Sequence, residues 1–307
     1  MNQQPKRQYG NFVVALYDVL NQSEKLKKWD NSCLLDAGDE SALQAYDETA
    51  GLIRKMRTVF RSIFDGIANF ESSVSTEMQT EAIKKDVEDA QSETIQHQSF
   101  SDTQIWFVRA ASDSGVVHIQ QICNMFSGMA LIHMLNIYLE VPARGAVSIG
   151  CGTDSLSVAE EEGQEIYGPV LETAYRLEDS VAKYPRVVVR EGLKKYLAEE
   201  LSKWSKNSID QDSTHTKYMV HFLKKANSCI LKDRDGQWIL DYAGEELAGQ
   251  LAHSFKSTGV QPSQVIHKAL AFTQQQISQH IDNGDEKLLG RYMLLKDYLE
   301  SRKQYWQ

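Results

Sequence analysis

NFVVALYDVL, residues 11–20, is the stretch from which the fold can be predicted. Its apolar and β-branched residues follow one another almost without interruption, which is the pattern of a strand buried inside a sheet. Near its end the run carries a carboxylate, Asp18. We therefore predict a buried strand that presents an acidic side chain at its last turn.

The segments that follow predict both helices and strands. An apolar stripe indicates a helix at 42–70, and an Asp-Gly pair indicates the tip of a hairpin at 233–236. The other expected elements are a hairpin at 98–110 turning at Ser101 and Asp102, a buried helix at 114–139, a strand at 144–152, a helix beginning near Pro169, a strand at 184–191, a helix at 191–204, a hairpin at 227–244 and three helical segments within 245–307. Since the strands are not each followed by a crossover helix, we predict an α+β fold with an antiparallel sheet flanked by helices.

The chain is expected to divide unequally. Residues 1–244 contain all of the predicted strands, and residues 245–307 are predicted to be helical throughout. The helical segment is short for an independent domain. We expect it to be a C-terminal extension that packs on the main domain or on a partner chain.

Composition narrows the class of protein. The 307 residues are 42 % hydrophobic and 24 % charged, with a net charge of −9, which argues against general nucleic-acid binding. The apolar run at 129–141 is too short and too interrupted to span a bilayer, and no leader pattern opens the chain. The four cysteines are scattered without zinc spacing. We expect reduced thiols, a cytoplasmic location, and neither membrane nor nucleic acid as a partner.

Two carboxylates, Asp18 and Asp102, stand at the ends of predicted strands. Neighbouring strands of a sheet lie about 4.8 Å apart, so these side chains can converge on one divalent cation. Magnesium or manganese with a polyphosphate uses one or two protein carboxylates and fills its other positions with phosphate oxygens and water. The alternative is that each aspartate only caps a turn.

Four segments, in order, resemble the motifs of the class III nucleotidyl cyclases. NFVVALYDVL is similar to the first strand of that family, which ends in a metal-binding aspartate, and QSFSDTQIW (98–106) is similar to the hairpin that carries the second. RGAVSIG (144–150) resembles the Arg-x-Gly-Ile-x-x-Gly strand, with Ala146 in place of a glycine. IYGPVLETAYRLE (166–178) resembles the Trp-Gly-x-x-Val-Asn-x-Ala-x-Arg-Met-Glu helix.

The residues found in these motifs look most like those of the bacterial pyrimidine cyclases of the Pycsar anti-phage systems. The features concerned are the FSD hairpin, IYGP at the helix start, AKYPRVVV (182–189) and a DxDG…LDY hairpin (233–242). The resemblance implies a cyclase-like catalytic domain at 1–244. It also implies a homodimer whose two composite sites each take residues from both chains.

The resemblance assigns roles to matching positions. Asp18 and Asp102 would hold two Mn²⁺ or Mg²⁺ ions, with the backbone carbonyl of Val19 as a further ligand. Arg176 matches the arginine that stabilises charge on the α-phosphoryl group in the transition state. Arg144, the first residue of its motif, is expected among the substrate-binding residues.

The sequence also departs from the family pattern. Glu172 stands where the family has a ribose-orienting asparagine, and a carboxylate there repels a triphosphate unless it is paired. Gln98 and Glu165 occupy the positions that recognise the base in this family, the base-reading positions. The two residues do not match the pattern that recognises adenine or guanine. Lys232 is a candidate phosphate contact, with an ordinary surface lysine as the alternative.

The resemblance implies conversion of a pyrimidine nucleoside triphosphate, UTP or CTP, to a 3′,5′-cyclic nucleotide messenger in anti-phage defence. Two alternatives stay open, namely a purine cyclase and an inactive binding or scaffold domain derived from a cyclase. Glu172 favours the inactive domain. On the predicted helix it lies four residues before Arg176, so the two can also form a simple surface ion pair.

Overall fold

The computed structural model describes residues 8–20, 95–100, 103–112, 115–156, 164–207, 214–257 and 259–307, together with five single positions between 44 and 58. The predicted helix at 42–70 therefore lies almost wholly outside the described residues. Asp102 also lies outside them. The strands are β1 (Gln8–Val19), β2 (Gln96–Phe100), β3 (Thr103–Arg109), β4 (Ala143–Leu156), β5 (Gln164–Tyr167), β6 (Val187–Val189), β7 (Ile230–Lys232) and β8 (Trp238–Leu240). The helices are α5 (Ile119–Tyr138), α6 (Pro169–Ser180), α7 (Glu191–Asn207), α8 (Thr214–Ser228), α9 (Glu245–Ser257), α10 (Pro262–Asp282), α11 (Glu286–Arg302) and the short 3₁₀ helix η3 (Lys303–Trp306).

The strands form one sheet in the order β2-β3-β1-β4-β6-β8-β7, and β5 pairs with β4 beside this path. The predicted α+β fold with flanking helices is confirmed. The sheet is mixed, because β4 and β6 run parallel while every other pair is antiparallel. The connection from β4 to β6 passes through β5 and α6, and a parallel pair needs such a crossover.

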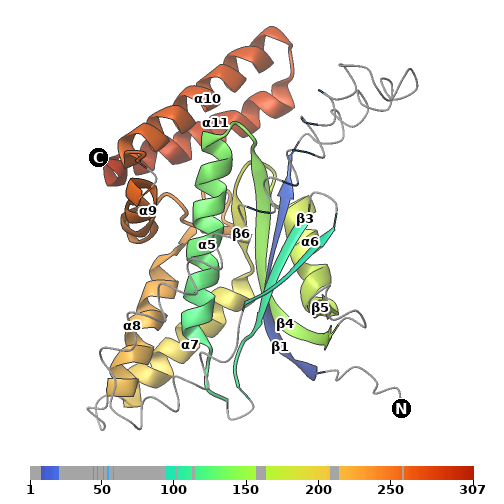
Figure 1. Ribbon diagram of the computed structural model, residues 1–307, viewed down its shortest axis with the longest axis vertical. Coiled ribbons are helices and arrows are strands. Elements are labelled where there is room, and N and C mark those ends of the chain that lie inside the picture. The colour runs from blue at the N-terminus through green and yellow to red at the C-terminus, as the bar shows by residue number, and fades with distance from the viewer. Residues whose placement is uncertain are drawn as a thin grey trace.

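Helices cover both faces of the sheet. Figure 1 shows α5 crossing one face and α6 lying on the other. The core on the α5 side contains Val13, Ala15 and Tyr17 of β1, whereas the core on the α6 side contains Phe12, Val14 and Leu16. This alternation is the period of two that a strand imposes. The near-continuous apolar run of β1 follows from its burial on both faces.

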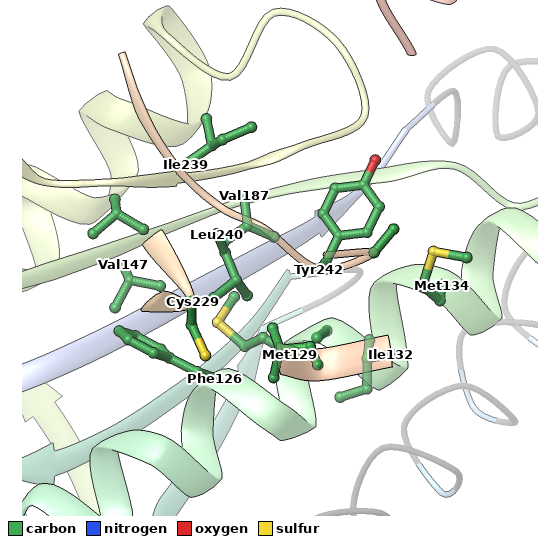
Figure 2. Close-up of a cluster of buried hydrophobic side chains, with 14 of the residues drawn as sticks. Phe126, Met129, Ile132, Met134, Val147, Val187, Cys229, Ile239, Leu240 and Tyr242 are labelled. Carbon is green, nitrogen blue, oxygen red and sulfur yellow. The ribbon is translucent and has the colours of Figure 1, made fainter. Parts of the chain in front are cut away.

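The larger core lies on the α5 side. Figure 2 shows Phe126 and Met129 of α5 packed against Val147 and Val187 of the sheet, with Leu240 of the late hairpin beside them. All five side chains are fully buried. Such packing explains why α5 is apolar on nearly all sides.

The C-terminal helices pack against this core. α10 contacts α5, and the two helices α10 and α11 lie together at one end of the molecule (Figure 1). Trp306 is buried and donates its indole N–H to the carbonyl oxygen of Ala243 at 3.0 Å. Tyr298 and Arg302 both donate to Asp241, at 2.8 and 2.9 Å. The boundary at residue 244 stays a prediction.

Glycines seat the start of α6 on β4. Gly168 has a φ of +116°, and a Cβ placed there would lie 3.2 Å from the Cα atom of Gly152. A side chain at Gly152 would in turn meet Val170 at 3.0 Å. The Gly-Pro turn therefore brings the first turn of α6 onto the strand, since only glycine allows both this conformation and this approach.

The other strands and helices follow the predictions closely where the chain is described. The hairpin β2–β3, the helices α5 and α7, the hairpin β7–β8 and the three C-terminal helices lie where they are predicted. Two elements, β5 and α8, are not predicted from the sequence. Within the described ranges, no helix is both long and apolar enough to cross a membrane.

Candidate functional site

The functional candidates gather on the α6 face of the sheet. Asp18 continues the even-numbered row of β1 that faces α6, and it pairs in register with Arg144 of β4. Leu16 pairs with Ile105, and Ile105 pairs in turn with Gln98 of β2. Because side chains alternate along a strand, Asp18, Arg144 and Gln98 all lie on this face.

Asp18 is held in place by its neighbour strand. The hydroxyl of Thr103 donates a hydrogen bond to Oδ1 of Asp18 at 3.0 Å, and the carboxylate is half-buried. The contact joins the first residue of β3 to the penultimate residue of β1. A hydrogen bond to a charged oxygen is stronger than one between neutral groups, so it fixes the orientation of the carboxylate.

Arg144 is engaged within the protomer. Its guanidinium forms an ion pair with the buried Glu178 of α6 and lies 3.7 Å from a carboxylate oxygen of Asp179. Burial raises the pKa of Glu178 to about 7, against the opposing charge of Arg144, and the nearby Asp18 raises it further. Arg144 thus ties α6 to the strand beside Asp18, and its expected role in substrate binding stays a prediction.

α6 presents a second pair of charges outward. The helix buries Val170, Ala174 and Glu178, while Glu172 and Arg176 are exposed. Nη2 of Arg176 lies 3.1 Å from Oε1 of Glu172, so the surface ion pair predicted from their spacing is present. Arg176 therefore points away from the sheet of its own protomer.

Burial, with the charges of Asp18 and Glu178, raises the pKa of Tyr175 on the same helix. Its side chain is 39 % exposed, which makes it one of the larger apolar groups on this surface. α6 is therefore close enough to the end of β1 for the charge of Asp18 to act on Tyr175.

Gln98 is buried, with 7 % of its surface exposed. Its Oε1 accepts a hydrogen bond from the backbone N–H of Ile166 at 3.1 Å, which assigns the orientation of the amide. Its Nε2 is buried and has no acceptor among the described residues. A buried donor without a partner costs about 1–3 kcal/mol, so this amide is suited to a ligand that accepts a hydrogen bond.

The structure does not bring the side chains of Gln98 and Glu165 together. Ile166 faces the α6 core, so its neighbour Glu165 points to the opposite face of β5. There the carboxylate of Glu165 accepts a hydrogen bond from the hydroxyl of Tyr167. This hydrogen bond, followed by burial and by the charge of the Glu165 carboxylate, raises the pKa of Tyr167.

Lys232 lies far from Asp18 within one protomer. It belongs to the outermost strand β7, which β4, β6 and β8 separate from β1. Its side chain is exposed, and Nζ lies 5.8 Å from the ring centroid of Trp238. A shared role of Lys232 and Asp18 would require a second copy of the chain.

Asp18 provides the kind of ligand that Mg²⁺ and Mn²⁺ prefer, an oriented carboxylate oxygen at the end of a strand. Val19, next along the chain, is the last residue of β1. Asp102, the second expected ligand, lies outside the described residues. Over the parts of the chain that the structure describes, no three acidic, histidine or cysteine side chains converge as a metal site. Asp18 therefore fits the expected ions as one of two carboxylates.

Two residues around Asp18 were not assigned roles from the sequence. Thr103 orients the carboxylate and Glu178 holds Arg144 beside it. Thr103 directly follows Asp102, so its place in the hairpin was predictable, but its contact depends on the register between β1 and β3. Glu178 matches the last residue of the helix motif, and no separate signal in the sequence marked it as buried.

Comparison with known proteins gives likenesses only among solved structures. No family model and no curated protein sequence matches the chain. The adenylyl cyclase CyaB from P. aeruginosa aligns at 13 % identity with a TM-score of 0.39, covering 63 % of this chain and 83 % of the other. The guanylyl cyclase domain of the RhoGC fusion protein from Blastocladiella emersonii aligns at 14 % identity with a TM-score of 0.38. The alignment covers 77 % of this chain and 96 % of the other.

A third structure, a class III adenylyl cyclase-like ATP-binding protein from Pseudomonas aeruginosa, aligns at 10 % identity with a TM-score of 0.40. It covers 62 % of this chain and 35 % of the other. Likenesses of this size assign neither a family nor a substrate to this chain, because one fold hosts many functions.

Proposed function

We propose that the protein is a nucleotide cyclase that converts a pyrimidine nucleoside triphosphate into its 3′,5′-cyclic monophosphate and pyrophosphate. The observation that carries the proposal is the Asp18 carboxylate, which Thr103 orients on the face of the sheet that α6 covers. The order of the motifs in the sequence supports it. The product would be a second messenger in anti-phage defence.

The proposed enzyme is a head-to-tail homodimer. Arg176 points away from its own sheet and Lys232 lies on the far strand, so neither can join Asp18 within one protomer. In a two-fold dimer, Asp18 of one chain would face Arg176 and the base-reading residues of the other. Each dimer would then hold two equivalent sites.

In the proposed reaction the 3′-oxygen of the ribose attacks the α-phosphorus. The bond from that phosphorus to the oxygen bridging toward the β-phosphate breaks, pyrophosphate leaves, and the proton of the 3′-hydroxyl passes to solvent. Asp18, with Asp102 and the Val19 carbonyl, would hold two Mn²⁺ or Mg²⁺ ions, which supply charge neutralisation and a more acidic hydroxyl. Arg176 would stabilise the charge that develops on the α-phosphoryl oxygens.

Gln98 is compatible with a pyrimidine base. Its oxygen is used by the backbone of Ile166, so the amide N–H groups are what it can offer a ligand. Uracil and cytosine both carry a carbonyl oxygen at position 2 that accepts such a bond. Adenine offers ring nitrogens and guanine a carbonyl as acceptors, so ATP and GTP both compete with this assignment.

A second candidate is a binding domain without catalytic activity. The ion pair between Glu172 and Arg176 favours it, because it occupies the arginine that the reaction needs. The pair is exposed, however, and such pairs contribute at most about 1 kcal/mol, so a triphosphate can displace it.

The test incubates the purified protein with MnCl₂ and each of the four ribonucleoside triphosphates and identifies products by mass spectrometry. We expect a cyclic nucleotide from UTP or CTP. The control is Asp18→Asn, which keeps an oxygen acceptor for Thr103 but removes the charge. Product only from ATP or GTP would refute the pyrimidine assignment. If none of the four nucleotides gives a cyclic product, the proposal that the protein is a nucleotide cyclase is refuted.

A further inference from the structure

A fully buried arginine connects α6 to the turn of the β7–β8 hairpin. Arg186 is 2 % exposed and lies in the segment between α6 and β6. Its Nη1 donates to Oδ2 of Asp233 at 2.5 Å, and its Nη2 donates to Oδ2 of Asp235 at 2.6 Å. Both aspartates belong to the tight turn that follows Lys232.

The same guanidinium reaches the end of α6. Nη2 also donates to the carbonyl oxygen of Val181, the residue that caps the C-terminus of α6, at 2.7 Å. The backbone oxygen of Arg186 accepts the N–H of Gly145 at 2.9 Å, one residue from Arg144. Arg186 therefore joins three elements, with its side chain bonded to α6 and the hairpin and its backbone oxygen bonded to β4.

The turn is shaped to receive this arginine. The hydroxyl of Tyr184 donates to the same Oδ2 of Asp233 at 2.6 Å, and the Tyr184 ring lies 4.7 Å from the Arg186 guanidinium carbon. Oδ1 of Asp235 accepts the backbone N–H of Gln237 at 3.1 Å. Burial alone would disfavour a charged guanidinium, and two carboxylates at hydrogen-bond distance offset that cost.

We infer that Arg186 is a positioning residue that fixes the β7–β8 turn, and with it Lys232, relative to α6. The inference rests on the proposed function and adds to it that Lys232 contacts the triphosphate in the site to which Arg176 of the same chain contributes. Those two residues lie on separate elements, and Arg186 is the buried charge that binds both elements at once. Loosening it moves Lys232 and leaves the Asp18 end of the sheet in place.

The substitution Arg186→Lys keeps the positive charge. A lysine ammonium group, however, lacks the planar set of N–H donors with which the guanidinium binds two carboxylates and a carbonyl oxygen at once. We expect Arg186→Lys to speed hydrogen exchange of the amides at 232–237 at least tenfold while those of β1 and β4 keep their protection. The KM for the triphosphate should rise about tenfold, with kcat within threefold of wild type. Arg302→Lys, which alters another arginine–aspartate pair, is the matched control and should leave the KM unchanged.

A double-mutant cycle separates positioning from general destabilisation. Lys232→Ala should raise the KM by itself, and Arg186→Lys should add less than twofold in that background. A merely structural role predicts that the two effects multiply, which would overturn the inference. Unchanged exchange at 232–237 in Arg186→Lys would overturn it as well.

Binding of inorganic tripolyphosphate with MnCl₂, measured by calorimetry, distinguishes this inference from the proposed function. If wild type makes no cyclic nucleotide, the proposed reaction fails. The positioning role then stands if Arg186→Lys and Lys232→Ala weaken tripolyphosphate binding about equally. It falls if only one of them does, or if wild type does not bind.

Discussion

Thr103 holds the carboxylate of Asp18 through a hydrogen bond of 3.0 Å that joins β3 to the end of β1. Asp18 is thus oriented before any ligand arrives. An oriented carboxylate loses less freedom when it binds a cation than a mobile one does.

Replacing Thr103 by valine should lower kcat about tenfold or more, because a tenfold change corresponds to about 1.4 kcal/mol and a hydrogen bond to a charged group contributes about 1.5–3 kcal/mol. Valine keeps the shape and the β-branch of threonine, so the unfolding temperature should change little. Thr103→Ser restores the donor and should recover most of the activity. Equal activity in Thr103→Val and wild type would show that Asp18 needs no such support.

Arg176→Ala should reduce kcat by at least about a hundredfold, the usual effect of removing a group that stabilises transition-state charge. The side chain is exposed, so the free energy of unfolding should change by less than about 0.5 kcal/mol. Glu172→Gln frees the arginine and should lower the KM. A higher KM in Glu172→Gln would mean that the glutamate contacts the substrate directly.

The ion pair between Arg144 and Glu178 gives a prediction on stability that is independent of function. Glu178→Ala leaves the arginine facing a buried cavity and should destabilise the fold by about 3 kcal/mol in denaturant unfolding. The double variant Arg144→Met with Glu178→Leu replaces both charges by apolar side chains and should be more stable than Glu178→Ala alone. The reverse order would show that the pair itself stabilises the fold.

His133 makes stability depend on pH. It is fully buried, its Nδ1 lies 2.9 Å from the Tyr17 hydroxyl, and burial lowers its pKa from 6.5 to about 4. Between these values the unfolded chain binds a proton that the folded chain does not, so stability falls as the pH is lowered from 6.5 to 4. The loss from this group should be about 3 kcal/mol.

Chemical denaturation at several pH values measures this loss. His133→Gln should flatten the slope between pH 6.5 and 4, whereas the exposed control His221→Gln should keep it. If both variants keep the slope of wild type, other groups govern the acid sensitivity.

Much of the fold was predictable because strong local signals coincide with the elements. β1 is a continuous apolar run that is buried on both faces, and the Asp-Gly pair marks the β7–β8 turn where Gly236 has a φ of +85°. β5 is only four residues long, so its alternation is too short to stand out. The parallel pairing of β4 with β6 depends on a crossover that local patterns do not reveal.

The candidate residues could be named from the sequence, but their contacts could not. Asp18, Gln98 and Arg144 share a face only because β1, β3, β2 and β4 pair in one particular register. The same register places Glu165 on the other face, away from its expected companion. Arg186 meets Asp233 and Asp235 across 47 and 49 positions of sequence, a distance over which no spacing rule applies.

The central claim is that Asp18 of one protomer works with Arg176 of its partner, and mixing two inactive variants tests it most directly. Asp18→Asn and Arg176→Ala are each assayed alone and then mixed in equal amounts under conditions of subunit exchange. Half of the dimers then carry one intact composite site, so the mixture should recover about a quarter of wild-type cyclase activity. A mixture as inactive as its components, with exchange verified by mass spectrometry, would contradict the account.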